Sequence, residues 1–267
     1  MNARSTVLTR LRETHPLVHC MTNTVVPQIT ANVLLAVGAA PAMIDLPDEA
    51  EMFAPVASAL LINVGNGLSE QHTGMRRAAA AAQRAGTPWV LDPVAVGGLP
   101  VRTALASELL AHRPGAIRGN ASEVAALAGV GAGGRGVDST DSPEAVLDAA
   151  RDLARRTQAV VAVSGPVDIV TGPGRTTRIT GGHPLMPLVI GTGCSLGAVV
   201  AACLGAVRNT DLDPHDAVAA AHALFGAAGV AAGREADAPA SFEIAWRDAL
   251  FRLTPADVDS LVTVEES

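Results

Sequence analysis

The sequence contains no lysine, since all 19 of its basic residues are arginine. This absence excludes several sites that need a lysine amine: the phosphate-binding loop of Walker A proteins, a Schiff base with a carbonyl substrate, and the Ser-x-x-Lys nucleophile. A bound phosphate group would have to be held by arginine or by backbone N–H groups.

Cysteine and positive charge are also scarce. Cys20, Cys194 and Cys203 have neither the even count of a disulfide framework nor the close spacing of a zinc site, so we expect reduced thiols and a cytoplasmic protein. The formal net charge of −7 argues against a nucleic-acid partner or an anionic membrane surface, because both are held mainly by surplus positive charge.

Long apolar segments are missing too. The N-terminal residues lack the apolar core of a secretory signal. The longest apolar runs, residues 198–207 and 217–232, are too short or contain a histidine, and both are rich in alanine and glycine rather than leucine. We therefore expect buried helices and no membrane partner.

What is present favours an α/β fold. With 267 residues, 49% of them apolar, the chain is long enough for a large core, and we expect one domain spanning residues 1–267. Apolar runs of strand length occur at residues 39–44, 60–64, 89–91, 116–117, 160–163 and 168–171. Helical spacing occurs at residues 28–37, 70–85, 121–128 and 144–157. This alternation predicts a three-layer sandwich, with a mostly parallel central sheet and helices on both faces.

Other segments interrupt the alternation. Residues 168–180 are predicted to form a hairpin that turns at Gly172-Pro173-Gly174, and the glycine-rich residues 129–136 a surface loop. Long alanine-rich helices follow, up to residue 253, and Thr254 opens a polar tail. In such a sheet, functional loops lie at the carboxyl ends of the strands.

The strongest local signal is Gly191-Thr192-Gly193-Cys194, directly before a predicted helix at residues 195–208. Glycines allow backbone N–H groups to turn toward a ligand, and a helix N-terminus adds partial positive charge. This pattern indicates an anion site that needs no lysine. Seen alone, it is equally typical of an ordinary glycine-rich helix start with a buried cysteine.

Further motifs occur in a characteristic order. They are His19-Cys20-Met21-Thr22-Asn23, Thr30-Ala31-Asn32, Ala40-Pro41-Ala42-Met43, Ile62-Asn63-Val64-Gly65, Leu91-Asp92-Pro93-Val94, Arg118-Gly119-Asn120-Ala121-Ser122-Glu123, Gly136-Val137-Asp138-Ser139, Gly182-His183-Pro184-Leu185-Met186 and Ser241-Phe242. With these motifs the chain resembles the hydroxyethylthiazole kinase family of the ribokinase-like superfamily, from about Pro16 to Leu253.

The resemblance implies a ribokinase-like fold and a reaction. The reaction would be magnesium-dependent transfer of the γ-phosphate of ATP to the hydroxyl of 4-methyl-5-(2-hydroxyethyl)thiazole, a salvage step for thiamine synthesis. It also implies a homotrimer with its sites between subunits.

The resemblance assigns the catalytic position to Cys194, where related sugar and vitamin kinases have a general-base aspartate. A thiol at a helix N-terminus is expected to have a lowered pKa and could accept the hydroxyl proton, although phosphoryl transfer makes little demand on a base. Gly191 corresponds to a substrate contact, and the backbone at Gly193 would hold the transferring phosphate. The alternative is that Cys194 is a buried, inert residue.

ATP contacts are implied for Arg118 and Ser164, and Asn23 would lie near the pocket mouth, where it reaches either ATP or a neighbouring subunit. An arginine can hold phosphate through two N–H groups at once, although Arg118 could instead pair with a carboxylate. For magnesium, Glu123 is the first candidate ligand and Asp92 the second, and both could instead cap helices or pair with arginine.

Met43 corresponds to the family's thiazole contact, where a thioether can pack against a sulfur-containing ring. A methionine at a strand end is also common as core filler. His19 and His183 are expected to be structural, because neither has a second histidine or cysteine at ligand spacing.

The chain departs from the family pattern at Ile190, at Pro166 and at residues 238–242. Ile190 could reshape the phosphate end of the pocket and so alter substrate preference. Three alternatives stay open at this point. They are a kinase for hydroxymethylpyrimidine or a sugar, a thiol hydrolase or acyltransferase that pairs Cys194 with a histidine, and an inactive thiazole-binding protein.

Overall fold

In the computed structural model, which describes residues 2–130 and 142–267, nine strands form one sheet with the order β2-β1-β3-β4-β5-β6-β7-β8-β9. The strands are β1 (Leu17–Met21), β2 (Ala40–Ala42), β3 (Ala59–Asn63), β4 (Trp89–Asp92), β5 (Ala116–Asn120), β6 (Val160–Ser164), β7 (Val167–Thr171), β8 (Thr176–Thr180) and β9 (Thr263–Glu266). Strands β1 to β6 pair in parallel, and β7, β8 and β9 extend the sheet by antiparallel pairing.

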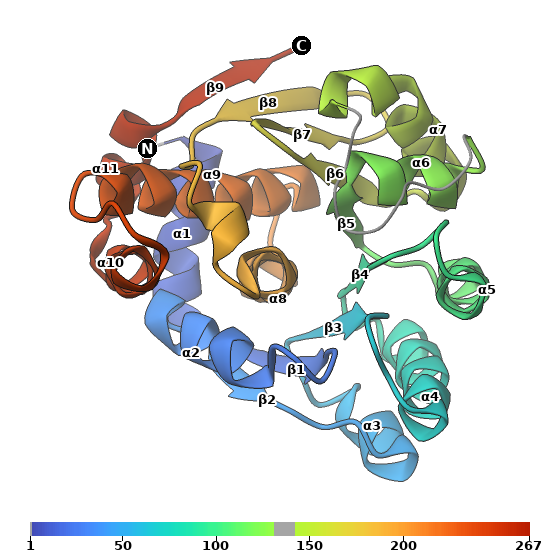
Figure 1. The fold of residues 1–267 in the computed structure, drawn as a ribbon. Helices are drawn as coiled ribbons and strands as arrows, with labels where there is room; N and C mark the ends of the chain where they lie inside the picture. The colour runs from blue at the N-terminus through green and yellow to red at the C-terminus, as the bar shows by residue number, and fades with distance from the viewer. Residues whose placement is uncertain (1, 131–141) are drawn as a thin grey trace.

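Helices cover both faces of the sheet, as Figure 1 shows. The sheet curves around one group, which comprises α1 (Ala3–Thr14), α2 (Pro27–Val37), α8 (Thr192–Val207), α9 (Pro214–Gly233), α10 (Pro239–Arg252) and α11 (Pro255–Leu261). The outer face carries α3 (Pro47–Phe53), α4 (Ser69–Ala85), α5 (Pro100–Leu109), α6 (Ala121–Ala128) and α7 (Leu147–Thr157). Three short 3-10 helices, Leu110–His112, Pro143–Val146 and Met186–Leu188, complete the helices of the described residues.

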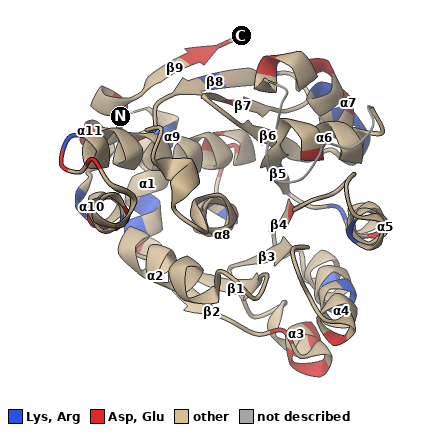
Figure 2. Ribbon diagram, viewed as in Figure 1, with Lys and Arg blue, Asp and Glu red and all other residues tan. Residues whose placement is uncertain are grey.

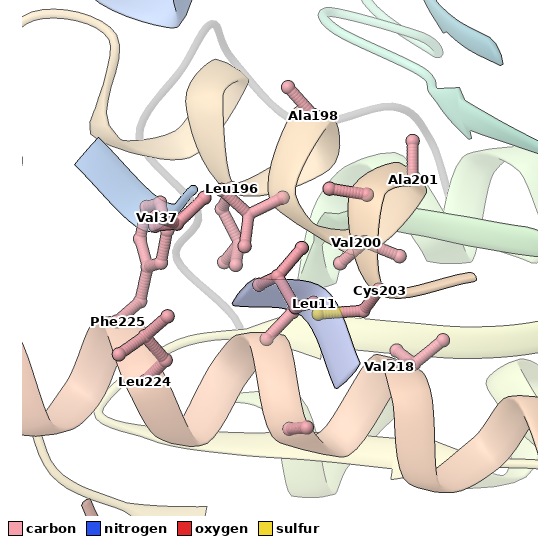
Figure 3. Packing of buried hydrophobic residues seen from close by; sticks show 14 of the residues in the cluster. Leu11, Val37, Leu196, Ala198, Val200, Ala201, Cys203, Val218, Leu224 and Phe225 are labelled. Carbon is pink, nitrogen blue, oxygen red and sulfur yellow. The ribbon is translucent and has the colours of Figure 1, made fainter. Parts of the chain in front are cut away.

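The inner face holds the larger hydrophobic cluster. Figure 3 shows side chains of α8, such as Leu196 and Val200, packed among those of α1, α2 and α9, including Leu11, Val37 and Phe225. Helix α8 carries no charged residue (Figure 2), and most of its side chains are buried. At Gly197 it lies so close to the sheet that an added Cβ would be 3.1 Å from Leu61 Cδ1. This packing fixes α8 against the middle strands.

The predicted mostly parallel sheet with helices on both faces is confirmed. The six predicted strands, the four helices and the hairpin at residues 168–180 are all present, with shifted ends. Strand β5 continues to Asn120, so that Arg118 lies within a strand, and α8 begins three residues earlier than predicted. The glycine-rich residues 129–136 and the motif at residues 136–139 lie largely or wholly outside the described residues.

Several elements were not predicted. Strand β1 contains His19, which interrupts its apolar run, yet that ring is buried and bonds Ile44 O through Nε2 at 2.8 Å. The polar tail predicted after Thr254 is wrong, because those residues form α11 and the edge strand β9. A partly exposed edge strand such as β9 needs few apolar side chains, so its sequence gives a weak signal.

Helix α9 is long and apolar enough to cross a bilayer by length and composition alone. In this fold, 78% of its apolar 18-residue stretch is buried, and the helix packs against β6, β7 and β8. Its composition is therefore that of a core helix.

We expect Leu61→Ala to destabilise the protein by about 2–5 kcal/mol, because Leu61 is fully buried between β3 and α8 and truncation leaves a cavity. The control is Leu68→Ala, since Leu68 is 69% exposed and its truncation should cost less than about 0.5 kcal/mol. Urea unfolding followed by circular dichroism measures both values. Equal losses would contradict the proposed packing of α8 on the sheet.

Candidate active site

Polar side chains gather where the parallel strands end. Asn63, Asp92, Asn120 and Ser164 are the last residues of β3, β4, β5 and β6, and Asn23 follows β1 by two residues. Because neighbouring parallel strands end at the same edge of a sheet, these residues lie along one line, opposite the N-terminus of α8. The polar residues at the strand ends thus gather at the edge where the sequence led us to expect functional residues.

Two glycines lie at the start of α8: Gly191 caps the helix and Gly193 is in its first turn. Gly191, the N-cap residue, has φ +89°, and an added Cβ there would be 2.5 Å from Ile29 Cγ2. No side chain caps this helix in the described part of the chain. Helix first turns have N–H groups without an intrahelical acceptor, so α8 directs unpaired donors toward the strand ends. A side chain at position 191 would meet both backbone strain and a steric clash.

Arg118 lies over this helix end. Its Nε and Nη2 atoms donate to Ser164 Oγ at 3.2 and 2.8 Å, and Nη1 is 3.1 Å from where a Cβ on Gly193 would be. Within the described residues, Arg118 forms no ion pair with a carboxylate, so the alternative of a structural arginine salt bridge is not what the fold contains. The structure brings Arg118, Ser164 and Gly193 together, and their donors can hold an anion.

A chain of hydrogen bonds runs from Asp92 to the thiol. Asp92 Oδ2 accepts from Asn63 Nδ2 at 2.7 Å, Asn63 Oδ1 accepts from Asn23 Nδ2 at 3.2 Å, and the same Asn23 nitrogen is 3.4 Å from Cys194 Sγ. Asn63 Oδ1 also accepts from Gly65 N at 3.0 Å. These bonds fix the Asn23 amide beside the sulfur. The sequence did not single out Asn63 as a site residue, although an asparagine inside the apolar run at residues 60–64 was the available signal. The structure shows that its side chain is fully buried and hydrogen-bonded.

The expectation of a lowered pKa for Cys194 is wrong. Burial is the main cause that raises the pKa of this thiol, and the nearby Asp92 carboxylate adds to it. Arg118 and the two asparagine amides offset only part of the rise, which leaves the pKa at about 11. Desolvation outweighs the partial charge of the helix N-terminus here, because it disfavours the thiolate directly. Cys194 is therefore a neutral thiol near pH 7.

The two acidic candidates have different surroundings. Burial raises the pKa of Asp92 to about 7, with Arg118 lowering it and Glu123 raising it, and Asp92 Oδ1 has no hydrogen-bond partner among the described residues. Glu123 caps α6, since its Oε2 accepts from Asn120 N and its Oε1 from Ala95 N, both at 2.9 Å. The free oxygen thus belongs to Asp92, which sequence reasoning ranked second.

Met43 directly follows the short strand β2, beside β1, and is 39% exposed. It therefore belongs to neither hydrophobic core, contrary to the core-filler alternative. Three other exposed apolar side chains, Val25, Leu188 and Ile190, are close in sequence to Asn23 and Gly191. Apolar surface thus lies open beside the polar groups of the site.

The two singled-out histidines have packing roles. His19 contacts Phe53 edge-to-face, and His183 stacks on Phe242 with ring centroids 5.2 Å apart. The hydrogen bond described for Cys194 comes from an asparagine amide rather than a histidine. This geometry lacks the base that a thiol hydrolase or acyltransferase would need.

Comparisons with known proteins agree on one family. The model of the "Hydroxyethylthiazole kinase family" matches residues 8–256. The hydroxyethylthiazole kinase of Corynebacterium glutamicum (strain R) is 57% identical over 260 residues, which cover 97% of each chain. The structure of the hydroxyethylthiazole kinase protein from Pyrococcus horikoshii OT3 superposes with a TM-score of 0.90 at 34% identity, covering 100% of both chains. A ribokinase-like superfamily protein from Enterococcus faecalis V583 shares the fold, with a TM-score of 0.64 at 13% identity over 91% of this chain and 88% of that chain.

The raised pKa of Cys194 predicts slow alkylation. At pH 8 we expect iodoacetamide to label Cys194 roughly 100-fold more slowly than an ordinary exposed cysteine, because about one thiol in a thousand is ionised when the pKa is about 11. Asp92→Asn removes a negative charge that disfavours the thiolate, so labelling at pH 9 should become faster. Below about pH 6, where Asp92 is protonated, the two proteins should not differ.

Peptide mass mapping of metal-free protein follows the label at Cys194, and Cys203→Ala excludes a contribution from the buried thiol of the same helix. Fast labelling at pH 7, or equal rates with and without the Asp92 charge at pH 9, would contradict this account.

Proposed function

The chain belongs to the hydroxyethylthiazole kinase family, and we propose that Arg118, Cys194 and the first turn of α8 form its catalytic centre. The enzyme is a phosphotransferase with an alcohol acceptor, and its substrate is the hydroxyl of 4-methyl-5-(2-hydroxyethyl)thiazole. The product, the thiazole monophosphate, serves thiamine synthesis by salvage. The observation that supports the site is an arginine that, within the described residues, has no carboxylate partner. It lies beside a thiol and a helix N-terminus that no described side chain caps.

ATP is the co-substrate that a kinase implies, and we place its phosphates at Arg118, Ser164 and Gly193. Because Ser164 holds the guanidinium on its Nε and Nη2 side, Nη1 stays directed toward the helix end. The backbone N–H groups of the first turn add donors where negative charge spreads in the transition state. Asn23 lies at the same edge, and a contact of its amide with the nucleotide is part of this proposal.

In this proposal Cys194 positions the acceptor hydroxyl. A neutral thiol cannot take a proton, and its pKa of about 11 leaves little thiolate near pH 7. In a loose phosphoryl transfer the attacking oxygen loses its proton late, so the reaction depends on alignment more than on a strong base. Asn23 and Asn63 act on this step by fixing the orientation of the sulfur.

Magnesium fits the acidic end of the site. Asp92 Oδ1, a buried carboxylate oxygen that has no partner among residues 2–130 and 142–267, is the hard ligand that this ion prefers, and Glu123 lies near enough to raise the pKa of Asp92. We propose that Asp92 holds the ion and that Glu123 supports it while capping α6. Bound magnesium would neutralise charge on the transferring phosphate.

The thiazole ring needs apolar surface, and Gly191 and Met43 are the contacts that we propose. The side chains of Met43, Val25, Leu188 and Ile190 are exposed, which leaves the apolar side of the site open in a single chain. We propose that a homotrimer covers it, with each site between two subunits. Ile190 then lies where a neighbouring chain and the substrate meet, and it influences which alcohol is accepted.

We also propose that residues 1–267 act as one kinase domain in the cytoplasm. All strands of the described residues join a single sheet, which supports one domain. The three cysteines are free thiols, as expected of a reducing compartment.

Phosphate transfer tests the catalytic centre. With ATP and magnesium the native chain should form the thiazole monophosphate, and EDTA should abolish the reaction. Cys194→Ala should lower kcat roughly 10- to 100-fold without abolishing turnover, while Cys194→Ser, which keeps a polar group in place, should retain more activity. Arg118→Ala should raise the KM for ATP about 10- to 100-fold, and Arg118→Lys should rescue it poorly, because a lysine cannot bind phosphate through a fork of N–H groups.

The matched control is Cys203→Ala, which removes a buried thiol from the same helix and should change stability but not kcat. If Cys194→Ser is as slow as Cys194→Ala, the thiol acts as a base rather than by position. Thiazole binding without any phosphate transfer would identify a binding protein, and transfer only to hydroxymethylpyrimidine would identify a different acceptor.

Sedimentation equilibrium tests the trimer. We expect a mass of about three chains for the native protein, and Ile190→Asp should shift it to smaller species and weaken thiazole binding, because it adds a charge to an apolar contact. Val101→Asp is the control, since Val101 is equally exposed on α5 at the opposite layer of the sheet. A single-chain mass for the native protein would refute the interface.

A further inference from the structure

A buried ionisable pair joins the core helix α9 to the strand that follows Ser164. His222 Nδ1 is 2.7 Å from Asp168 Oδ2, and the side chain of His222 is fully buried while that of Asp168 is 20% exposed. His222 Nε2 has no hydrogen-bond partner in the described residues. Replacing such a pair by well-packed apolar side chains is often neutral or stabilising, so stability alone is a weak reason for its presence.

The other carboxylate oxygen of Asp168 forms a hydrogen bond next to the proposed ATP contact Ser164. Asp168 Oδ1 accepts from Gly165 N at 2.8 Å, and Gly165 directly follows Ser164, the residue that holds Arg118. Gly165 is also confined from the other side, since an added Cβ would be 2.5 Å from Pro143 Cγ. The turn after β6 is therefore fixed by a hydrogen bond on one side and by close packing on the other.

Ser164 is also paired with Asn120 at the ends of β5 and β6. Arg118 is on β5, two residues earlier, so its guanidinium and the Ser164 hydroxyl come from adjacent strands. A shift of the Gly165 turn would move Ser164 Oγ and leave two N–H groups of Arg118 without their acceptor. Small displacements of positioning groups lower the rate of catalysis strongly.

We infer that Asp168 and His222 are positioning residues for nucleotide binding, which they influence through the Gly165 turn, Ser164 and Arg118. Neither residue touches the reacting atoms. The imidazole donates from Nδ1 to Asp168 Oδ2, which keeps that carboxylate oriented toward Gly165 N. The inference rests on the proposed role of Arg118 in holding the phosphates of ATP.

Helix α9 offers a matched control. His215 lies seven residues before His222, is likewise buried, and bonds a strand residue, with Nε2 2.8 Å from Thr177 Oγ1. Thr177 belongs to β8, and this hydrogen bond involves neither Ser164 nor Arg118. Loss of either histidine removes one hydrogen bond between α9 and the sheet, but only the loss of His222 should weaken nucleotide binding.

The experiment measures binding of the non-hydrolysable analogue AMP-PCP with magnesium by calorimetry, together with the KM values for ATP and for the thiazole. We expect His222→Phe and Asp168→Ala to weaken AMP-PCP binding and raise the KM for ATP about tenfold, with the KM for the thiazole changed less than about twofold. His222→Asn, whose amide nitrogen can stand in for Nδ1, should restore most of the affinity. His215→Phe should lower the unfolding temperature without this selective effect.

Equal effects of His215→Phe and His222→Phe on nucleotide affinity, or equal changes in the KM values for both substrates, would overturn the inference. Asp168→Ala keeps the test available if His222→Phe does not fold, because Asp168 is only partly buried. Arg118→Ala distinguishes a failure of the proposed role of Arg118 from a failure of the positioning role of Asp168 and His222 alone. If it does not weaken AMP-PCP binding, the proposed role of Arg118 fails and the inference with it. If it does while Asp168→Ala does not, only the positioning role fails.

Discussion

The close packing of α8 on the middle of the sheet is the constraint on which the site depends. Gly197 lets the helix approach Leu61 and Asp92 closely, and the rest of α8 is apolar and buried among α1, α2 and α9 (Figure 3). This contact fixes where the helix begins, and therefore where its unpaired N–H groups point. The strand ends and the helix N-terminus face each other because one apolar helix packs across parallel strands.

The second feature of the site is the arrangement of its charged groups at the carboxyl edge of the sheet. The chain has no lysine, and in the described residues the Arg118 guanidinium has a hydroxyl partner, Ser164, instead of a carboxylate. The acidic groups lie further along the same edge, where Asp92 Oδ1 has no hydrogen-bond partner among the described residues. Among the described residues, Arg118 and Asp92 are thereby close enough to shift the pKa of Asp92 without forming a direct ion pair.

Burial has opposite consequences for the two ends of the hydrogen-bonded chain. It raises the pKa of Asp92 to about 7 and that of Cys194 to about 11, so the carboxylate titrates near neutral pH while the thiol stays protonated. A buried thiol beside a carboxylate is a poor base, which makes its position more important than its ionisation. The asparagines between the two groups accordingly have a structural function, since they fix the orientation of the Cys194 thiol.

The sequence by itself determined the fold class and the family. Alternating apolar runs and helical patterns are local signals, and ordered motifs such as Arg118-Gly119-Asn120 and Gly191-Thr192-Gly193-Cys194 are specific when they occur together. The properties of individual site residues were harder to predict. The pKa of Cys194, the partners of Glu123 and the contacts of Asn63 depend on neighbours that are distant in sequence. The pairing of Asp168 with His222 spans 54 residues and leaves no local pattern. Only the tertiary structure decided these points, since desolvation and hydrogen-bond partners exist only after distant segments have packed.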